Sequence, residues 1–281
     1  MDYLWVHCSW TAIAAPSCDI FGLRISQRYS LGNILGVAAS GSPEVSQTAV
    51  DILEAGGNAF DAALGALCTA SIAEPLLTSL GGGGFLLALP DGQKPRVYDF
   101  FCQTPRNKRS EKELDFYPIM ANFGTAEQEF HIGMGSMAVP GVVAGIFEAH
   151  RELGRMSVAE IMAPAIGLAR SGVVVDAFHH YIIRILRPIM RATPESFALY
   201  ESPEKPDELI REGELLCNSA AADAMEALIL EGPDLFYRGE WAARLAADSS
   251  DKGGHLTIED LENYVVERRE PVVFRYRGVK C

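Results

Sequence analysis

Apolar residues recur along this chain with two periods, and each period predicts a different kind of element. Spacing of three and four residues predicts a helix over residues 43–55 and another over residues 141–153. Short apolar runs bounded by turn residues predict strands at residues 34–39, 85–89 and 97–100. Residues 59–73 are apolar on nearly every side, so we expect this helix to be buried at the centre of the molecule.

Capping residues sharpen the helix boundaries. Ser42 and Asn58 stand where N-caps of the first two helices are expected, and Gly56 stands where a left-handed residue would end the first. Ser157 and Glu160 form a capping-box pattern for a helix that reaches Ala169 and ends by Gly172. Further helices are predicted at residues 219–231, 240–247, 258–264, and 176–200 with breaks at Pro188 and Pro194.

Two strands next to the central helix are predicted to form a hairpin. Four glycines at residues 81–84 lead into Phe85, and Pro90, Asp91 and Gly92 supply the turn. Residues 110–135 mix charged and aromatic side chains and are predicted to be loop, whereas residues 271–276 alternate as a final strand would. A small strand-containing unit followed by many helices favours an α/β or α+β class.

Composition removes several functional classes. The 281 residues are 48% hydrophobic and carry a formal charge of −13, so a nucleic-acid partner is not expected. The basic residues at 106–109 are followed at once by acids and are interpreted as a solvated loop. No apolar run reaches bilayer-spanning length. Residues 1–32 are treated as an extension of uncertain order, whose apolar start lacks the basic beginning of a signal peptide.

Pattern alone predicts no chemistry. The glycine run follows a helix and precedes a strand, which is the reverse of a phosphate-binding loop. His179 and His180 are adjacent on a helix and cannot chelate one metal from one face, and six dispersed cysteines favour neither a zinc site nor a disulfide framework. Cys102 follows a strand as a nucleophile could, but a packed thiol is the favoured interpretation. Neither a metal nor a cofactor is expected.

Several ordered motifs resemble one known family. The sequences AGGNAFDAA (55–63), EP (74–75), GGGGF (81–85), GSMAVPG (135–141), FYRG (236–239) and GGHLTIEDLENY (253–264) resemble the large subunit of gamma-glutamyltranspeptidases, or glutathione hydrolases. The similarity covers residues 33–281. It implies an N-terminal-nucleophile hydrolase, an α+β protein built as a four-layer αββα sandwich, of which this chain holds an incomplete part with a large helical portion.

The resemblance also implies a mechanism. Family members are made as one precursor that cuts itself into two subunits, and the new N-terminal threonine of the small subunit attacks a gamma-glutamyl amide. No residue of this chain matches that threonine, which is expected after Cys281, so the chain looks like a fragment that is inactive alone. The expected partners are the small-subunit part and a gamma-glutamyl or related amide. Family members are often periplasmic or extracellular, but the chain start carries no convincing export signal.

One position departs from the family. The family usually has an arginine directly after Asp-Phe, where it pairs with the α-carboxylate of the glutamyl group. This chain has Phe101 there, followed by Cys102 and Gln103, and these three residues are the candidate substrate-binding residues. Phenylalanine cannot provide a bidentate pair to a carboxylate, which favours other acyl groups, as in acylase-like relatives. Two alternatives stay open: Phe101 packs beneath the hairpin, or the chain is a non-catalytic scaffold or truncated product that associates with a small-subunit partner.

Overall fold

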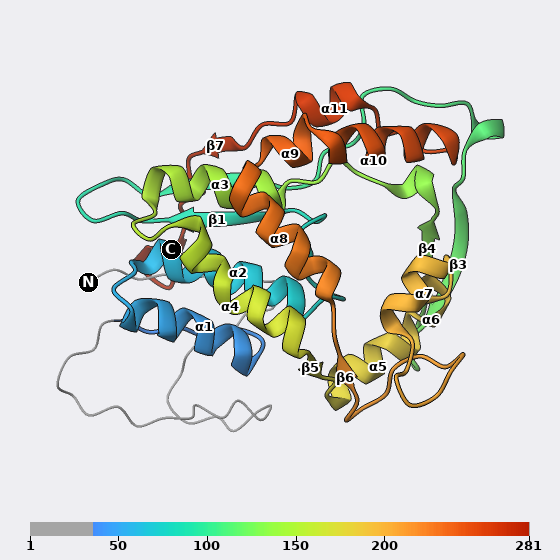
Figure 1. Ribbon diagram of the computed structural model, residues 1–281. Coiled ribbons are helices and arrows are strands. Elements are labelled where there is room, and N and C mark those ends of the chain that lie inside the picture. The colour runs from blue at the N-terminus through green and yellow to red at the C-terminus, as the bar shows by residue number, and fades with distance from the viewer. Residues whose placement is uncertain (1–35, 281) are drawn as a thin grey trace.

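A computed structural model describes residues 36–280 of the chain, with the side chain of Lys280 left out (Figure 1). The predicted extension at residues 1–32 lies outside the described residues. The helices of four or more residues are α1 Pro43–Glu54, α2 Ala59–Ala73, α3 Val142–Leu153, α4 Val158–Ser171, α5 Ala177–Ile185, α6 Arg187–Met190, α7 Pro194–Tyr200, α8 Ser219–Glu231, α9 Asp234–Tyr237, α10 Glu240–Asp251 and α11 Ile258–Glu262. The strands are β1 Gly84–Ala88, β2 Arg96–Phe100, β3 Tyr117–Asn122, β4 Glu127–Ile132, β5 Val173–Val174, β6 Leu215–Leu216, β7 Glu267–Arg269, β8 Arg275–Tyr276 and β9 Val279–Lys280.

Local capping explains why α1 and α2 begin where the sequence predicts. The hydroxyl of Ser42 accepts a hydrogen bond from the Val45 amide, and Pro43 occupies the first turn. Asn58 and Asp61 form a capping box at the start of α2, which is buried along almost its whole length. Gly56 adopts φ +96°, the left-handed conformation that ends α1.

Asp61 also joins α2 to a segment far away in the sequence. Its carboxylate is fully buried and accepts hydrogen bonds from the amides of Asn58 (2.9 Å), Arg155 (3.0 Å) and Met156 (3.3 Å). The side-chain amide of Asn58 donates to the carbonyl of Leu153 at 2.7 Å. The start of α2 is therefore tied to the connection between α3 and α4.

The predicted hairpin is present and becomes a sheet by addition of a third strand. β1 and β2 pair antiparallel, with Leu86 opposite Tyr98, and β7 pairs antiparallel with β2. The prediction of a strand at residues 271–276 is wrong for residues 271–274, because the chain pairs earlier, at β7, where ion pairs fix it. The guanidinium of Arg268 reaches Glu148 (2.6 Å) and Glu152 (2.5 Å) on α3.

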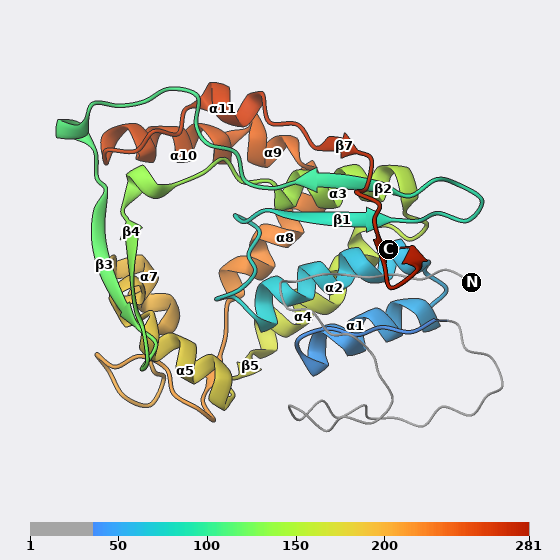
Figure 2. The same ribbon diagram turned by 180° about the vertical axis from the view of Figure 1, so that it is seen from behind.

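The two faces of this sheet have opposite environments. Leu86, Ala88, Tyr98 and Phe100 are buried in the main hydrophobic core together with α2, α3 and α4. In Figure 1, α3 and α8 lie in front of β1, and the view from behind in Figure 2 shows β1 and β2 in front of these two helices. Apolar side chains on the other face are exposed, namely Phe85, Leu87, Leu89 and, just beyond β2, Phe101. We call these four residues the open apolar face.

Two other sequence predictions are wrong. Residues 110–135 were predicted to be loop, but β3 and β4 form a hairpin there in which Ala121 is buried and most other side chains are exposed. Such a hairpin shows no regular alternation of apolar and polar residues. Residues 36–39, predicted to belong to a buried strand, form no strand, and Val37 is 81% exposed. Ile34 and Leu35 lie outside the described residues.

The remaining helices form two smaller cores. Pro188 and Pro194 stand at the starts of α6 and α7, as the breaks predicted there require, and Tyr200 packs with Ile183 and Ile210. α9, which the sequence did not predict, packs with α11 in a cluster that includes Val143 and Tyr264. Within residues 36–280 no helix is both long and apolar enough to cross a membrane.

Candidate functional site

The three predicted binding residues lie immediately after β2, at the edge of the open apolar face. The ring of Phe101 is 55% exposed and stacks on the ring of Phe85, with a centroid distance of 5.4 Å and an interplanar angle of 13°. The interpretation that Phe101 packs beneath the hairpin is therefore wrong, because Phe100 fills that position. The pair of rings forms an exposed aromatic surface, and its role toward a substrate stays a prediction.

Main-chain hydrogen bonds hold this segment in place. Gln103 forms an isolated antiparallel bridge with Val139, with N–H to O=C distances of 3.1 and 2.8 Å. Gly83 passes so close that a β-carbon there would lie 2.4 Å from the Cys102 nitrogen. A β-carbon on Gly141 would lie 2.0 Å from the Phe100 carbonyl oxygen. The glycines at these two positions are thus required by close backbone packing.

Two stacked tyrosines stand behind the segment. The hydroxyl of Tyr264 donates to the Phe101 carbonyl at 3.0 Å, and its ring stacks on that of Tyr237 at 5.5 Å. The hydroxyl of Tyr237 donates to the Pro140 carbonyl (3.0 Å) and accepts from the Ala144 amide (3.2 Å). Burial, with a smaller contribution from nearby Cys102, raises the pKa of both phenols, which keeps them protonated as donors.

Cys102 has the properties of a packed thiol. It is partly buried, and burial raises the pKa of its thiol. A hydrogen bond with the Gly141 backbone lowers that pKa by a smaller amount. A thiol acts as a nucleophile through its thiolate, which a raised pKa makes scarcer. The geometry thus agrees with the favoured interpretation from the sequence.

The charged groups at this edge pair with one another within the protein. The carboxylate of Asp99 accepts a hydrogen bond from the Phe101 amide at 3.1 Å and forms an ion pair with Arg269 at 2.6 Å. Arg269 also lies 3.3 Å from Glu267. The guanidinium is already paired with two carboxylates, so the side chains around Phe101 favour an apolar group over a free carboxylate.

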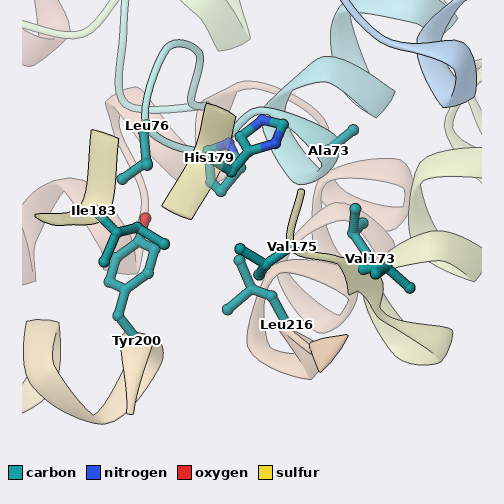
Figure 3. Close-up of a pocket in the computed structure, with 10 residues that line it drawn as sticks. Ala73, Leu76, Val173, Val175, His179, Ile183, Tyr200 and Leu216 are labelled. Atoms are coloured by element: carbon teal, nitrogen blue, oxygen red, sulfur yellow. The ribbon is translucent and has the colours of Figure 1, made fainter. Parts of the chain in front are cut away.

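The other candidate residues lie elsewhere. His179 contacts Asp176 at 2.8 Å and lines a cavity of about 10 Å³, which has room for about one water molecule (Figure 3). Its other lining residues are mostly apolar, including Val173, Val175 and Leu216. Among residues 36–280 no three His, Cys, Asp or Glu side chains gather as a metal site would require, so neither His179 nor His180 belongs to such a group.

Comparison with known proteins places this geometry in a family. The family model of gamma-glutamyltranspeptidase matches residues 45–281. The chain belongs to the gamma-glutamyltranspeptidase family. It is 32% identical over 245 residues to the acylase ACY 1 proenzyme of Pseudomonas sp. strain SE83, covering 86% of this chain and 43% of that protein. It is 30% identical over 277 residues to the glutathione hydrolase proenzyme of Escherichia coli K12, covering 96% and 46%.

Solved structures confirm the fold. The gamma-glutamyltranspeptidase of Helicobacter pylori superposes with a TM-score of 0.77 at 26% identity, covering 89% of this chain and 69% of that one. The cephalosporin acylase of Bacillus halodurans gives 0.70 at 27% identity, covering 85% and 44%. The predicted α+β, N-terminal-nucleophile-hydrolase fold is therefore confirmed. The chain spans less than half the length of the two proenzymes named above.

The sequence did not identify the tyrosines that hold residues 101–103 from behind, nor the distant partners of Asp61. Tyr237 and Tyr264 lie within motifs that carried the resemblance, FYRG and GGHLTIEDLENY, but nothing in their spacing indicates that the two rings meet. Asp61 was assigned only to the first turn of its helix. In each case the partner is distant in sequence, which a local pattern cannot show.

Proposed function

We propose that this chain forms the scaffold and one wall of the acyl pocket of an enzyme that cleaves gamma-glutamyl or related acyl amides. Family membership supports the reaction class, and the exposed stack of Phe101 on Phe85 supports the location of the pocket. The observation that carries the proposal is that Phe101 stands, exposed, where the family usually has its carboxylate-binding arginine. Residues 33–281 form the family-like part in this proposal.

The nucleophile in this proposal belongs to the second part of the proenzyme. The hydroxyl of an N-terminal threonine attacks the amide carbonyl while the threonine's own α-amine takes the hydroxyl proton. Collapse of the tetrahedral intermediate releases the amine, which receives that proton, and leaves an acyl ester. Water or an acceptor amine then attacks the ester and regenerates the threonine. No residue of this chain takes a catalytic role in these steps, and no cofactor or metal enters them.

The open apolar face supports a second part that packs against it. Phe85 and Leu87 are 56% and 44% exposed on a sheet whose other face is buried. Exposed apolar patches of this kind mark interaction surfaces, and sheets of a sandwich cover each other in this way. We propose that the small-subunit part of the proenzyme covers it.

Substrate preference tests the proposal. The chain is assembled with its second part, and turnover is compared for a gamma-glutamyl anilide and for a matching glutaryl anilide, which lacks the α-amino and α-carboxylate groups. Phe101→Arg restores a charge-assisted pair worth about 1.5 to 3 kcal/mol, so KM for the gamma-glutamyl substrate should fall roughly 10- to 100-fold. Phe116→Arg, at an exposed phenylalanine elsewhere, is the control and should change neither KM.

An unchanged KM in Phe101→Arg would contradict the pocket assignment. The 281-residue chain alone is expected to be inactive, and turnover of the anilide by it would contradict the role given to the second part. The alternative, a non-catalytic scaffold, is favoured by the open apolar face itself. It predicts an assembled complex, detected by light scattering, that turns over neither anilide.

A further inference from the structure

The residues that fix the position of Phe101 are on a different part of the chain from Phe101 itself. The ring of Phe101 touches only the exposed ring of Phe85 among the described aromatic side chains, and both rings are more than half exposed. A stacked aromatic pair contributes about 0.5 to 1.5 kcal/mol, and both of these rings remain largely in water. The place of the Phe101 ring is therefore set in large part by the backbone that carries it.

That backbone segment is held from one side by a single side-chain hydroxyl. The Phe101 carbonyl accepts its hydrogen bond from Tyr264, whose side chain is 7% exposed. The Tyr264 hydroxyl lies 2.1 Å from where a β-carbon of Gly141 would be, so only a glycine at position 141 leaves room for it. The donor thus lies between the Phe101 carbonyl and Gly141, beside the two backbone segments that form the Gln103–Val139 bridge.

Tyr237 fixes Tyr264 in turn. Its ring stacks on that of Tyr264 with an interplanar angle of 17°. Its hydroxyl donates a hydrogen bond to the Pro140 carbonyl and accepts one from the Ala144 amide. The two phenols therefore hold both sides of the bridge, the Phe101 side through Tyr264 and the Pro140 side through Tyr237. Neither phenol reaches the open apolar face where a substrate would lie.

We infer that Tyr264 is a positioning residue of the acyl pocket: through its bond to the Phe101 carbonyl it sets where the Phe101 ring meets the substrate. The inference rests on the proposed function for its meaning in catalysis. The structural part of the inference is that Tyr264 restrains residues 101–103, and this restraint can be measured without any enzyme activity.

The first test uses Tyr264→Phe in the 281-residue chain, which keeps the ring stack and removes the hydroxyl. Cys102, next to Phe101, is labelled with iodoacetamide and quantified by peptide mass spectrometry, with Cys68, fully buried in α2, as the internal reporter of global opening. Loss of one hydrogen bond should raise the Cys102 labelling rate about 2- to 12-fold and leave Cys68 unchanged. Tyr98→Phe is the matched control, because Tyr98 is fully buried and donates to Glu152 instead.

A merely structural tyrosine gives a different result. Equal acceleration at Cys68 and Cys102, or a lower melting temperature with unchanged Cys102 labelling, would overturn the inference. In the assembled enzyme, Tyr264→Phe should raise KM for the preferred anilide about 2- to 12-fold with a smaller change in kcat. If the parent enzyme turns over no anilide, the proposed function fails while the labelling result still decides the restraint on residues 101–103.

Discussion

Replacement of Asp61 by alanine is expected to be among the most destabilising changes in the described part of the chain. The carboxylate is fully buried and accepts amide hydrogen bonds from Asn58, Arg155 and Met156. Its removal leaves these partly buried donors unpaired, and an unsatisfied buried group costs about 1 to 3 kcal/mol. Partial access of water offsets some of this, so we expect a loss of about 3 to 5 kcal/mol in the free energy of unfolding.

Urea denaturation, monitored through the helical signal in circular dichroism, measures this loss in the free energy of unfolding. Asp61→Asn keeps one acceptor oxygen and should lie between alanine and the parent. Asp51→Ala is the control, because Asp51 is exposed on α1 and bonds only Gln47, and a change of at most about 0.5 kcal/mol is expected there. If Asp61→Ala stays within about 1 kcal/mol of the parent, the reasoning that this carboxylate joins α2 to the α3–α4 connection is refuted.

Two further predictions concern packing and pH. Gly145→Ala places a β-carbon 2.3 Å from the Phe100 ring and should cost about 1 to 3 kcal/mol in thermal unfolding, whereas Gly167→Ala, with open space around it, should be neutral or stabilising. A comparable melting temperature for both variants would contradict this. Burial raises the pKa of Glu74, an effect that the interaction with His179 opposes, so ionisation of Glu74 destabilises the folded state as pH rises above the ordinary pKa of a glutamate. Glu74→Gln should therefore unfold at a higher temperature than the parent at pH 7, with the difference vanishing near pH 4, and an equal difference at both pH values would argue against ionisation as the cause.

Local signals in the sequence determined what could be predicted. The starts of α1, α2 and α4 were predicted correctly because the capping side chain and the helix it caps are within three residues of each other. β7 was missed because three consecutive charged residues, Glu267 to Arg269, show no apolar alternation. Their strand exists through pairing with β2 and ion pairs to α3 and Asp99, none of which is local.

The candidate site likewise has one part that the sequence predicts and another that it does not. Phe101, Cys102 and Gln103 were found because a family motif covers them, and the structure places them at the exposed edge of a sheet. The close approach of Gly83 to Cys102 was anticipated in kind, since four glycines before a strand predict a backbone or a substrate passing nearby. The sequence does not show which of the two it is, because the answer lies in the contact of Gly83 with Cys102 across the hairpin. Nor does it show the tyrosine pair behind the segment, because Tyr264 bonds Phe101 across a separation of 163 positions.

The hydrogen bonds of this segment explain how one fold can accept different side chains at position 101. Gln103 bonds Val139 through main-chain atoms only, and Phe101 is held through its own amide and carbonyl, by Asp99 and Tyr264. None of these bonds uses the side chain of residue 101. Exchange of a cationic for an aromatic side chain there therefore changes the chemistry of the exposed surface without removing a restraint on the backbone. For this reason Phe101→Arg is expected to alter substrate preference with a melting temperature close to that of the parent, and a large loss of stability would show that the Phe101–Phe85 stack holds the segment after all.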